Sequence, residues 1–388
     1  MIFINKCNNI MKRDSVKHIL MLLSNPATYD IRPLKEARTL AENGFKVIIL
    51  AWDREGIAPR LSLAENLLIH RLNLRAPYGQ SIKVLVRLLV FYMWCIITSF
   101  IYRFQAIHCH DADMFLCGVL LKVIRLGRVK LVYDMHDHPL IFLDRFPMHR
   151  FLVKVIFAVA RKYADHVIVV NEIFSDYLSK MGFEGQKISV IMNVPQTVYS
   201  TDKSNYNKKK FVILYYGNIN ADRGVLKLAE AIAGLKNVEL LLAGRGDLVS
   251  VIKVMEEKFN NIKYLGWIPI DEINKLTRQA DLIPSLYSPS NINNMMASPG
   301  KLFTAMAYGI PVLVPKGSYQ AKIAGRYKCG IAVNINDTTE VKNVIVKLIS
   351  SPDLHRELGE NGIKAVSRLF NWGIMEKRLI EMYSSLLF

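Results

Sequence analysis

The chain has 388 residues, with 51 Lys and Arg against 33 Asp and Glu, which gives a formal net charge of +18. Because 51% of the residues are hydrophobic and only 22% are charged, the composition excludes a disordered chain and predicts about two or three domains. The positive charge predicts a polyanionic partner, and nucleic acid, an acidic membrane surface and phosphorylated substrates all fit at this point. Five cysteines without metal-ligand spacing favour reduced thiols in a cytoplasmic protein.

The first half of the chain alternates short β-branched runs with longer helical patterns, an order typical of parallel α/β layers. Strands are predicted at residues 19–23, 47–51, 106–109, 131–134 and 166–170. Helices are predicted at residues 33–43, 82–103, 114–125 and 150–164. We therefore expect a Rossmann-like domain over residues 1–200, with its ligand site at the carboxyl ends of the strands.

The most apolar stretch, residues 88–102, contains no charge and lies between Arg87 and Arg103. A spanning helix needs about 20 apolar residues, so this run is short for a transmembrane segment. A buried helix of the α/β domain is the favoured interpretation. A helix that lies in a bilayer surface remains open, because arginines flank the run and aromatic residues lie within it.

A polar stretch at residues 197–210 predicts a linker, after which the alternation restarts. Strands are predicted at residues 211–216, 238–243, 263–265, 281–284, 312–314 and 331–333. We expect a second Rossmann-like domain over residues 201–370 and a final helix, within residues 371–388, that packs back on the first domain. Two doubly wound domains joined in this way would turn their ligand sites toward one cleft.

Two strand ends of the second domain carry glycines. Gly217 permits a close backbone approach, and Arg223 follows where a guanidinium can bind a diphosphate bidentately. Gly244 ends the next strand, but the Gly-x-Gly-x-x-Gly pattern is incomplete, so a nicotinamide dinucleotide site is not supported. A plain strand–loop–helix turn with a surface arginine is the alternative for the first segment.

The strongest local motif lies at residues 297–312. Ser298 is a candidate N-cap and Pro299 a first-turn proline, so a helix is predicted to begin there. Gly300 leaves the tip of that helix without a side chain, and Lys301 adds a cation. These features predict a phosphate site at the helix N-terminus, and a capped helix with nothing bound is the alternative.

In the first domain, His136 and Asp137 follow directly after the predicted strand at residues 131–134. His136 is placed to orient a sugar hydroxyl or to accept a proton. The segment Ile-His-Cys-His-Asp-Ala-Asp at residues 107–113 resembles a metal-ligand run. We expect no metal there, because strand alternation would separate its side chains onto opposite faces and no distant ligand set completes it.

Together these motifs resemble the group 1 retaining glycosyltransferases, whose fold is GT-B, over about residues 17–378. The opening strand and acceptor loop of that family are similar to residues 18–30, and its Asp-x-His-(Asp/Glu) loop is similar to residues 134–137. The basic residue before a glycine that opens its second domain is matched by Arg223. Its Ser-Pro-x-Lys-Leu-Phe stretch is matched by residues 298–312. The resemblance implies two Rossmann-like doubly wound domains that face a central cleft.

The resemblance also implies roles for individual residues, with the diphosphate at Arg223 and Lys301, the base at Trp267 and the sugar at His136. Catalytic roles fall on His136 and Asp137. Donor-binding roles fall on Gly217, Asn218, Arg223, Gly244, Trp267, Ile268, Ser298, Pro299, Gly300, Lys301, Leu302 and Thr304. No metal or other cofactor is expected, because basic groups and the helix dipole would stabilise the departing diphosphate.

Two positions depart from the family pattern. The paired glutamates, eight positions apart, would fall on Met296 and Thr304, and a threonine hydroxyl offers a ribose one hydrogen bond but no charge. Asn218 stands where the family has an arginine. The departures predict either a donor that is held differently or an activity that is reduced or absent.

The sequence therefore predicts a retaining glycosyltransferase that moves a sugar from a nucleotide sugar to a lipid-linked or cell-surface glycan. We expect it in the cytoplasm, peripheral at the inner face of an anionic cell membrane, because residues 82–130 carry seven Lys and Arg against two Asp. A catalytically impaired GT-B protein that binds a glycan or a partner enzyme is the alternative. A sugar-nucleotide epimerase and nucleic-acid binding are disfavoured, since neither cleft carboxylates nor an aromatic-interleaved basic motif is evident.

Overall fold

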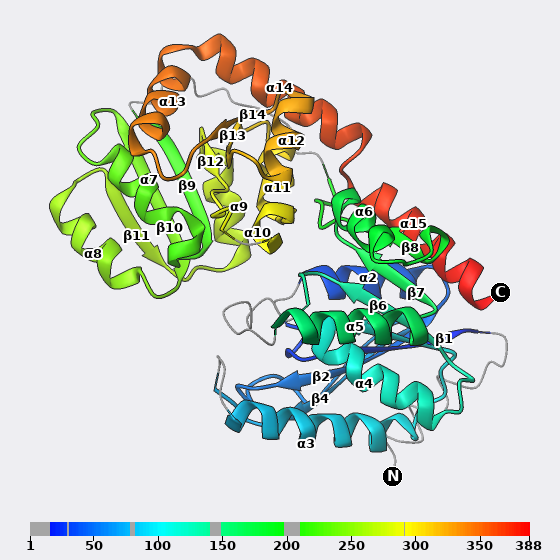
Figure 1. Ribbon diagram of the computed structural model, residues 1–388. Helices are drawn as coiled ribbons and strands as arrows, with labels where there is room; N and C mark the ends of the chain where they lie inside the picture. Colours follow the sequence, from blue (N-terminus) through cyan, green and yellow to red (C-terminus); the bar gives the residue numbers. More distant parts are fainter. Residues whose placement is uncertain (1–15, 29–30, 78–81, 140–148, 198–209, 291) are drawn as a thin grey trace. The chain divides into compact units, whose positions relative to one another are not determined.

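The computed structural model describes residues 16–28, 31–77, 82–139, 149–197, 210–290 and 292–388 (Figure 1). The chain divides into two compact units, one formed by Met1–Ile191 with Met375–Phe388 and the other by Met192–Ile374. The predicted linker, residues 197–210, lies almost wholly outside the described residues, as do residues 29–30 at the end of the predicted acceptor loop.

The first unit is built on one eight-stranded sheet. Its strands are β1 (His18–Leu23), β2 (Lys46–Asp53), β3 (Leu61–Ala64), β4 (Leu67–Asn73), β5 (Ala106–His110), β6 (Lys130–Met135), β7 (His166–Val169) and β8 (Ile188–Val190). Their order is β3-β4-β2-β1-β5-β6-β7-β8, with only the β3–β4 pair antiparallel. The five predicted strands are confirmed, whereas β3, β4 and β8 were not predicted. Every residue of β1 and β2 is buried, which explains their continuous apolar runs.

Helices cover both faces of this sheet (Figure 1). They are α2 (Ile31–Glu42), α3 (Ile82–Ser99), α4 (Asp111–Ile124), α5 (His149–Tyr163), α6 (Glu172–Lys180) and the C-terminal α15 (Trp372–Leu387). On one face, Tyr383 of α15 packs against Phe45, which immediately precedes β2. On the other, Phe91 of α3 stacks on Trp52 of β2, with ring centroids 5.6 Å apart. The four predicted helices are confirmed, but α3 is shorter than predicted and α4 starts earlier.

The second unit contains two three-stranded sheets, β11-β10-β9 and β12-β13-β14. The strands are β9 (Phe211–Asn218), β10 (Val238–Arg245), β11 (Ile262–Gly266), β12 (Ile283–Pro284), β13 (Val312–Pro315) and β14 (Gly330–Val333). A parallel bridge between Ile213 and Leu282 joins the two sheets into one doubly wound layer. All its pairings are parallel, and all six strands were predicted.

The helices of the second unit alternate with these strands, as a doubly wound layer requires. They are α7 (Val225–Ile232), α8 (Val249–Lys258), α9 (Ile270–Gln279), α10 (Ile292–Met296), α11 (Gly300–Ala307), α12 (Tyr319–Tyr327), α13 (Thr338–Ser350) and α14 (Pro352–Arg368).

Within the described parts of the chain, no helix has the length and apolar character needed to cross a bilayer. The four cysteines in those parts are buried free thiols. Cys7 lies outside them.

Candidate active site

Asp134 is the centre of a buried polar cluster at the carboxyl end of β6. Arg32 of α2 donates from Nη2 to Asp134 Oδ1 at 2.7 Å, and its Nη1 donates to the Ile191 carbonyl at 2.7 Å. His136 Nε2 lies 2.8 Å from Asp134 Oδ2, and His110 Nδ1 lies 3.1 Å from the same oxygen. One carboxylate therefore holds a guanidinium and two imidazoles that come from three separate segments.

His136, which we predicted to be catalytic, is the most accessible of these rings, with its side chain 19% exposed. Burial alone would lower its pKa, but Asp134 and Asp111 raise the pKa of His136 to about 10. Asp111 also accepts a hydrogen bond from the His136 backbone amide at 3.2 Å. A ring that keeps its proton at neutral pH donates a hydrogen bond to a ligand and does not accept a proton from one.

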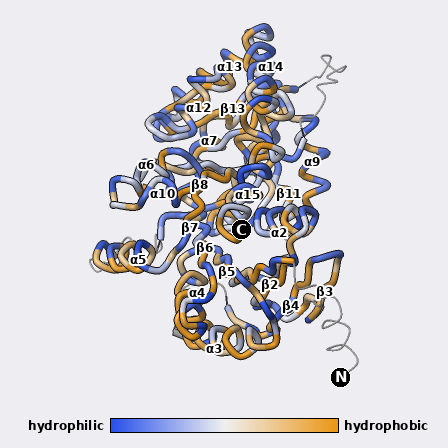
Figure 2. The backbone as a smooth tube through the Cα atoms, turned by 90° about the vertical axis from the view of Figure 1, so that its right-hand side faces the viewer, coloured by the Kyte–Doolittle hydropathy of each residue, from blue (hydrophilic) through white to orange (hydrophobic). Residues whose placement is uncertain are grey.

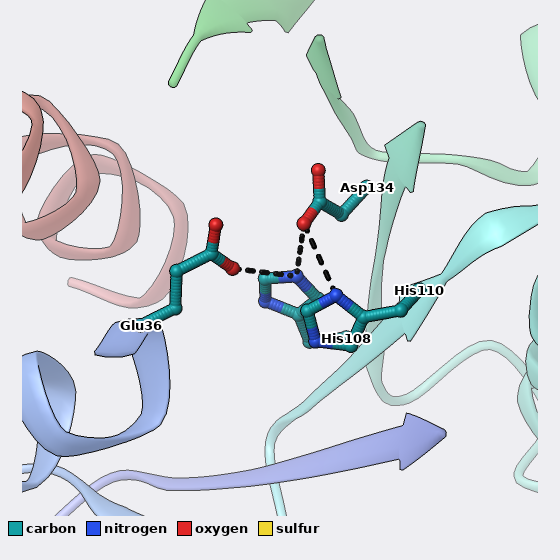
Figure 3. Close-up of side chains that lie close together, drawn as sticks. All are labelled: Glu36, His108, His110 and Asp134. Carbon is teal, nitrogen blue, oxygen red and sulfur yellow. Dashed lines mark ion pairs between the residues drawn. The ribbon is translucent and has the colours of Figure 1, made fainter. Parts of the chain in front are cut away.

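The expectation that strand alternation separates the side chains of residues 107–113 was wrong for its two histidines. His108 and His110 are two residues apart on β5, so they point to the same face of the sheet. With Glu36 of α2 and Asp134 of β6 they place one ligand atom each within 4.8 Å of one another (Figure 3). The additional ligands that the sequence did not reveal are thus supplied by α2 and β6.

The charges in this cluster are already paired. Arg32 lies 3.1 Å from Glu36 Oε1 as well as 2.7 Å from Asp134, so one guanidinium serves both carboxylates. Burial and the neighbouring Asp134 raise the pKa of Glu36 to about 8, which favours its protonated form. The Tyr383 hydroxyl lies 2.7 Å from His108 Nδ1 and fixes that ring from α15. Because Arg32 is a permanent cation next to both carboxylates, it would repel a metal ion bound by this ligand set.

Asp137, the other predicted catalytic residue, lies outside this buried cluster. Its side chain is exposed at the end of the segment that follows β6. Sequence reasoning missed Arg32 and Glu36, and it considered His108 and His110 only as part of a metal-ligand run that it set aside. The four-residue spacing of Arg32 and Glu36 on α2 was the available signal, because it places both side chains on one helix face.

In the second unit, the carboxyl ends of β9 and β10 come together at two glycines. Gly217 and Gly244 are register partners with φ of +127° and +149°. A Cβ on Gly244 would lie 1.8 Å from the Gly217 carbonyl oxygen, so the approach of the two strands requires glycine there. The Tyr264 hydroxyl donates to the Gly244 carbonyl at 2.9 Å and holds this edge from β11.

A pocket of about 270 Å³ opens at these strand ends. It is lined by Tyr216, Gly217, Asn218, Ala243, Gly244, Arg245, Trp267, Ile268 and Ile273. Five of the predicted donor-binding residues are therefore neighbours in one cavity. Arg245, which was not predicted although it follows Gly244 directly, lies over the Trp267 ring at 5.0 Å. The cavity combines an aromatic platform with a cation, a lining suited to a planar base.

Lys301 and Arg223 form a dibasic site beside this pocket. Lys301 Nζ donates to the Tyr216 carbonyl at 2.7 Å and lies 4.3 Å from the centre of the Tyr215 ring. The same Nζ would lie 3.1 Å from a Cβ on Gly217, and Arg223 Cζ stacks over Tyr287 at 4.2 Å. Burial, with the Arg223 charge, lowers the pKa of Lys301 to about 7. The two cations influence each other's charge and together favour binding of an anion.

The helix that carries Lys301 begins one residue later than predicted. Pro299, not Ser298, is the N-cap of α11, and Gly300 is its first residue. Proline offers no side-chain cap, so the first amides of the helix are not satisfied by one. Leu302 is one of the predicted donor-binding residues, and its backbone amide already donates to the Pro299 carbonyl at 3.0 Å.

Thr304, which stands where the family has glutamate, is hydrogen-bonded to the side chain of Tyr216. Tyr216 in turn lines the pocket. The tyrosine therefore occupies space next to the threonine that a longer acidic side chain would otherwise reach.

Comparison with known proteins identifies the family to which the chain belongs. A model of the group 1 glycosyl transferases matches residues 200–365, and a model of glycosyltransferase family 4 matches residues 34–194. Between them the two models take in both units. The chain belongs to the group 1 glycosyltransferases.

Relatives and solved structures of this glycosyltransferase agree with the fold. A putative glycosyltransferase EpsD of Bacillus subtilis is 23% identical over 312 residues, which are 73% of this chain and 77% of that one. Sucrose-phosphate synthase of Thermosynechococcus elongatus superposes with a TM-score of 0.78 at 17% identity, covering 95% of this chain and 99% of that one. HepE of Anabaena, solved with UDP-glucose, gives 0.71 at 17% identity and covers 95% and 99%. The fold of the chain is GT-B, with two Rossmann-like units.

Proposed function

We propose that the protein is a retaining, metal-independent glycosyltransferase that moves a hexosyl group from a nucleotide sugar to a lipid-linked or cell-surface glycan. The observation that carries the proposal is the dibasic site of Lys301 and Arg223 beside the Trp267 pocket. A nucleoside diphosphate has the matching pattern of charge and planar base. The structure of HepE with UDP-glucose supports a uridine nucleotide as the first candidate donor.

Sugar transfer from such a donor would use Lys301 and Arg223 to stabilise the leaving diphosphate. The bond between the anomeric carbon and the diphosphate oxygen breaks, and the acceptor oxygen bonds to the same carbon. The acceptor proton passes to the departing diphosphate, which makes attack on the face of the leaving group consistent with retention. Lys301 and Arg223 stabilise the charge that develops on that oxygen, with the dipole of α11 adding to them.

His136 is assigned to a sugar hydroxyl. Its raised pKa supports a role as a hydrogen-bond donor, because both neighbouring carboxylates favour the imidazolium. The Asp137 side chain is exposed, and we assign it to the acceptor.

The location and the acceptor are further parts of the proposal. A peripheral position on the inner face of the cell membrane is supported by the excess of positive charge over residues 82–130. An acceptor that carries a pyrophosphate-linked lipid would be attracted by the same charge.

A GT-B protein without catalysis is the second candidate. It is supported by Thr304, which lacks the charge of the family's glutamate, and by Asn218, which removes a cation from the pocket rim. If the protein lacks catalysis, we expect it to bind a glycan tightly and to transfer no sugar.

Donor binding is tested by calorimetry against a panel of nucleotide sugars. We expect one donor to bind and the Lys301→Ala variant to bind it about 100-fold more weakly, since a charge-assisted contact is lost. Lys322→Ala, which removes an exposed lysine from α12, is the matched control and should bind as wild type does.

The pH dependence of that affinity follows from Lys301. Its pKa of about 7 in the free protein rises when a diphosphate is bound, so the complex takes up a proton above pH 7. Affinity should therefore fall about tenfold per pH unit above 7 in wild type, and Lys301→Arg should lose this slope because arginine stays charged. Equal affinities of Lys301→Ala and Lys322→Ala would contradict the assignment.

A further inference from the structure

The described residues of the first unit leave an apolar surface exposed. We call it the α3–α4 face. From α3 and the residues after it, the exposed side chains are Leu85, Val86, Leu89, Val90, Met93, Ile97, Phe100 and Ile101. From α4 and the residues after it, they are Leu116, Leu120, Val123, Ile124 and Leu126. The two helices adjoin, because Arg125 Nη2 donates to the Ser99 carbonyl at 2.8 Å.

Helix α3 is apolar on both of its sides. Its inner side buries Phe91, Tyr92 and Cys95 against the rest of the unit, as a helix on a sheet should. Its outer series is 49–64% exposed and recurs at helical spacing, so the exposed groups form one continuous stripe. Scattered apolar side chains are normal on a surface, but a continuous patch of this kind marks an interaction site. Figure 2 shows both helices coloured mostly hydrophobic.

Most of the charges on the segments that form this face are positive. The sequence has no Asp or Glu between residues 82 and 110 or between residues 114 and 130. Arg103 and Arg128 are exposed at its margin. Arg125 stacks over the Phe100 ring at 4.7 Å, which keeps its cation beside the apolar stripe. Apolar groups with exposed cations at their margin complement a surface that has an apolar interior and an anionic boundary.

We propose that the α3–α4 face lies in the surface of an anionic lipid bilayer. The stripe on α3 would enter the acyl boundary with the helix in the membrane plane, and Arg103, Arg125 and Arg128 would contact lipid phosphates. The arrangement rests on the proposed function in one respect, since a lipid-linked acceptor would be presented at the same surface. The proposal names α3 as the element that contacts the membrane and the acyl boundary as the depth to which its apolar stripe enters.

Vesicle flotation tests the proposal with two matched pairs of substitutions. Wild type should float with vesicles of phosphatidylcholine and phosphatidylglycerol, and weakly with phosphatidylcholine alone. Leu89→Ser/Met93→Ser should lower the partition coefficient at least about tenfold, because both side chains leave the acyl boundary. Val251→Ser/Val254→Ser, which removes two exposed apolar side chains from α8 of the second unit, should have no effect.

The charge is tested separately. Arg103→Gln/Arg128→Gln should weaken binding to the anionic vesicles at least about fivefold at low salt and should reduce its salt dependence. Nucleotide-sugar affinity, measured on every variant, should stay at the wild-type value. This affinity depends on the second unit. If wild type bound no nucleotide sugar, the result would count against the proposed function and not against the bilayer contact.

Three results would overturn the proposal. Wild type that does not float with anionic vesicles at low salt would exclude the bilayer. Equal flotation of wild type and Leu89→Ser/Met93→Ser would place the contact elsewhere. Wild type that is a dimer by light scattering, with Leu89→Ser/Met93→Ser a monomer and neither binding vesicles, would show that a second copy covers the face.

Discussion

In the first unit, Asp134 and Arg32 each contact more than one group of opposite charge. Asp134 binds Arg32, His110 and His136, and Arg32 is shared with Glu36. The opposite pKa shifts of the imidazoles follow from their positions: burial, followed by the His108 charge, lowers the pKa of His110 to about 3, whereas two carboxylates raise the pKa of His136 to about 10. One histidine of the cluster is thus kept neutral and the accessible one is kept charged.

The charge state of His136 can be measured by NMR of its ring nitrogens. We expect an imidazolium at pH 8 that titrates near pH 10. Asp134→Asn should lower that pKa by about two units, because the strongest attraction is removed. The substitution should also cost about 3–5 kcal/mol of folding free energy, since Arg32 loses a buried partner. Asp176→Asn, an exposed acid on α6, is the control. Titration of wild-type His136 near its ordinary value would contradict the assignment.

Single elements differ in how well the sequence predicted them. Buried parallel strands such as β1 and β2 are continuous apolar runs, and their order along the chain was evident. The short β3 was not predicted, because its side chains are mostly exposed and it pairs only with β4. The start of α11 was predicted at Ser298 and lies past Pro299, because the chain keeps an extended ψ of 140° at the proline.

At the scale of elements, the close approach of β9 and β10 shapes the pocket that we propose for the donor. Gly244→Ala would force a Cβ to 1.8 Å from the Gly217 carbonyl oxygen, so the two strand ends must separate. We expect a loss of about 2–4 kcal/mol of stability and a donor affinity at least about tenfold weaker. Gly234→Ala is the control: its φ is +71° and nothing lies within 4 Å of the new Cβ. It should cost about 1 kcal/mol and leave affinity unchanged, and the same affinity loss in both variants would contradict this role for Gly244.

For the whole molecule, the sequence predicted two Rossmann-like units, because the alternation of strands and helices is a local feature. The glycines of the proposed donor pocket were predicted from their strand ends, whereas its aromatic wall was implied by the family resemblance. It did not predict the buried cluster of the first unit. Glu36, His108 and Asp134 come from three distant segments, and only the parallel order of the sheet brings them together. The net charge of +18 includes a dibasic site on the second unit and exposed arginines at the margin of the α3–α4 face of the first.

Glycosyltransferase activity is tested by following a radiolabelled sugar from its nucleotide to an acceptor. The donor found by calorimetry would be incubated with a bacterial polar-lipid and glycan extract in the presence of a chelator, with wild type and Lys301→Ala in parallel. We expect wild type to move the label into the lipid or glycan fraction with its anomeric configuration retained, unaffected by the chelator, and Lys301→Ala to be at least about 100-fold slower. Tight donor binding by wild type with neither transfer nor hydrolysis would contradict a glycosyltransferase and favour the non-catalytic partner.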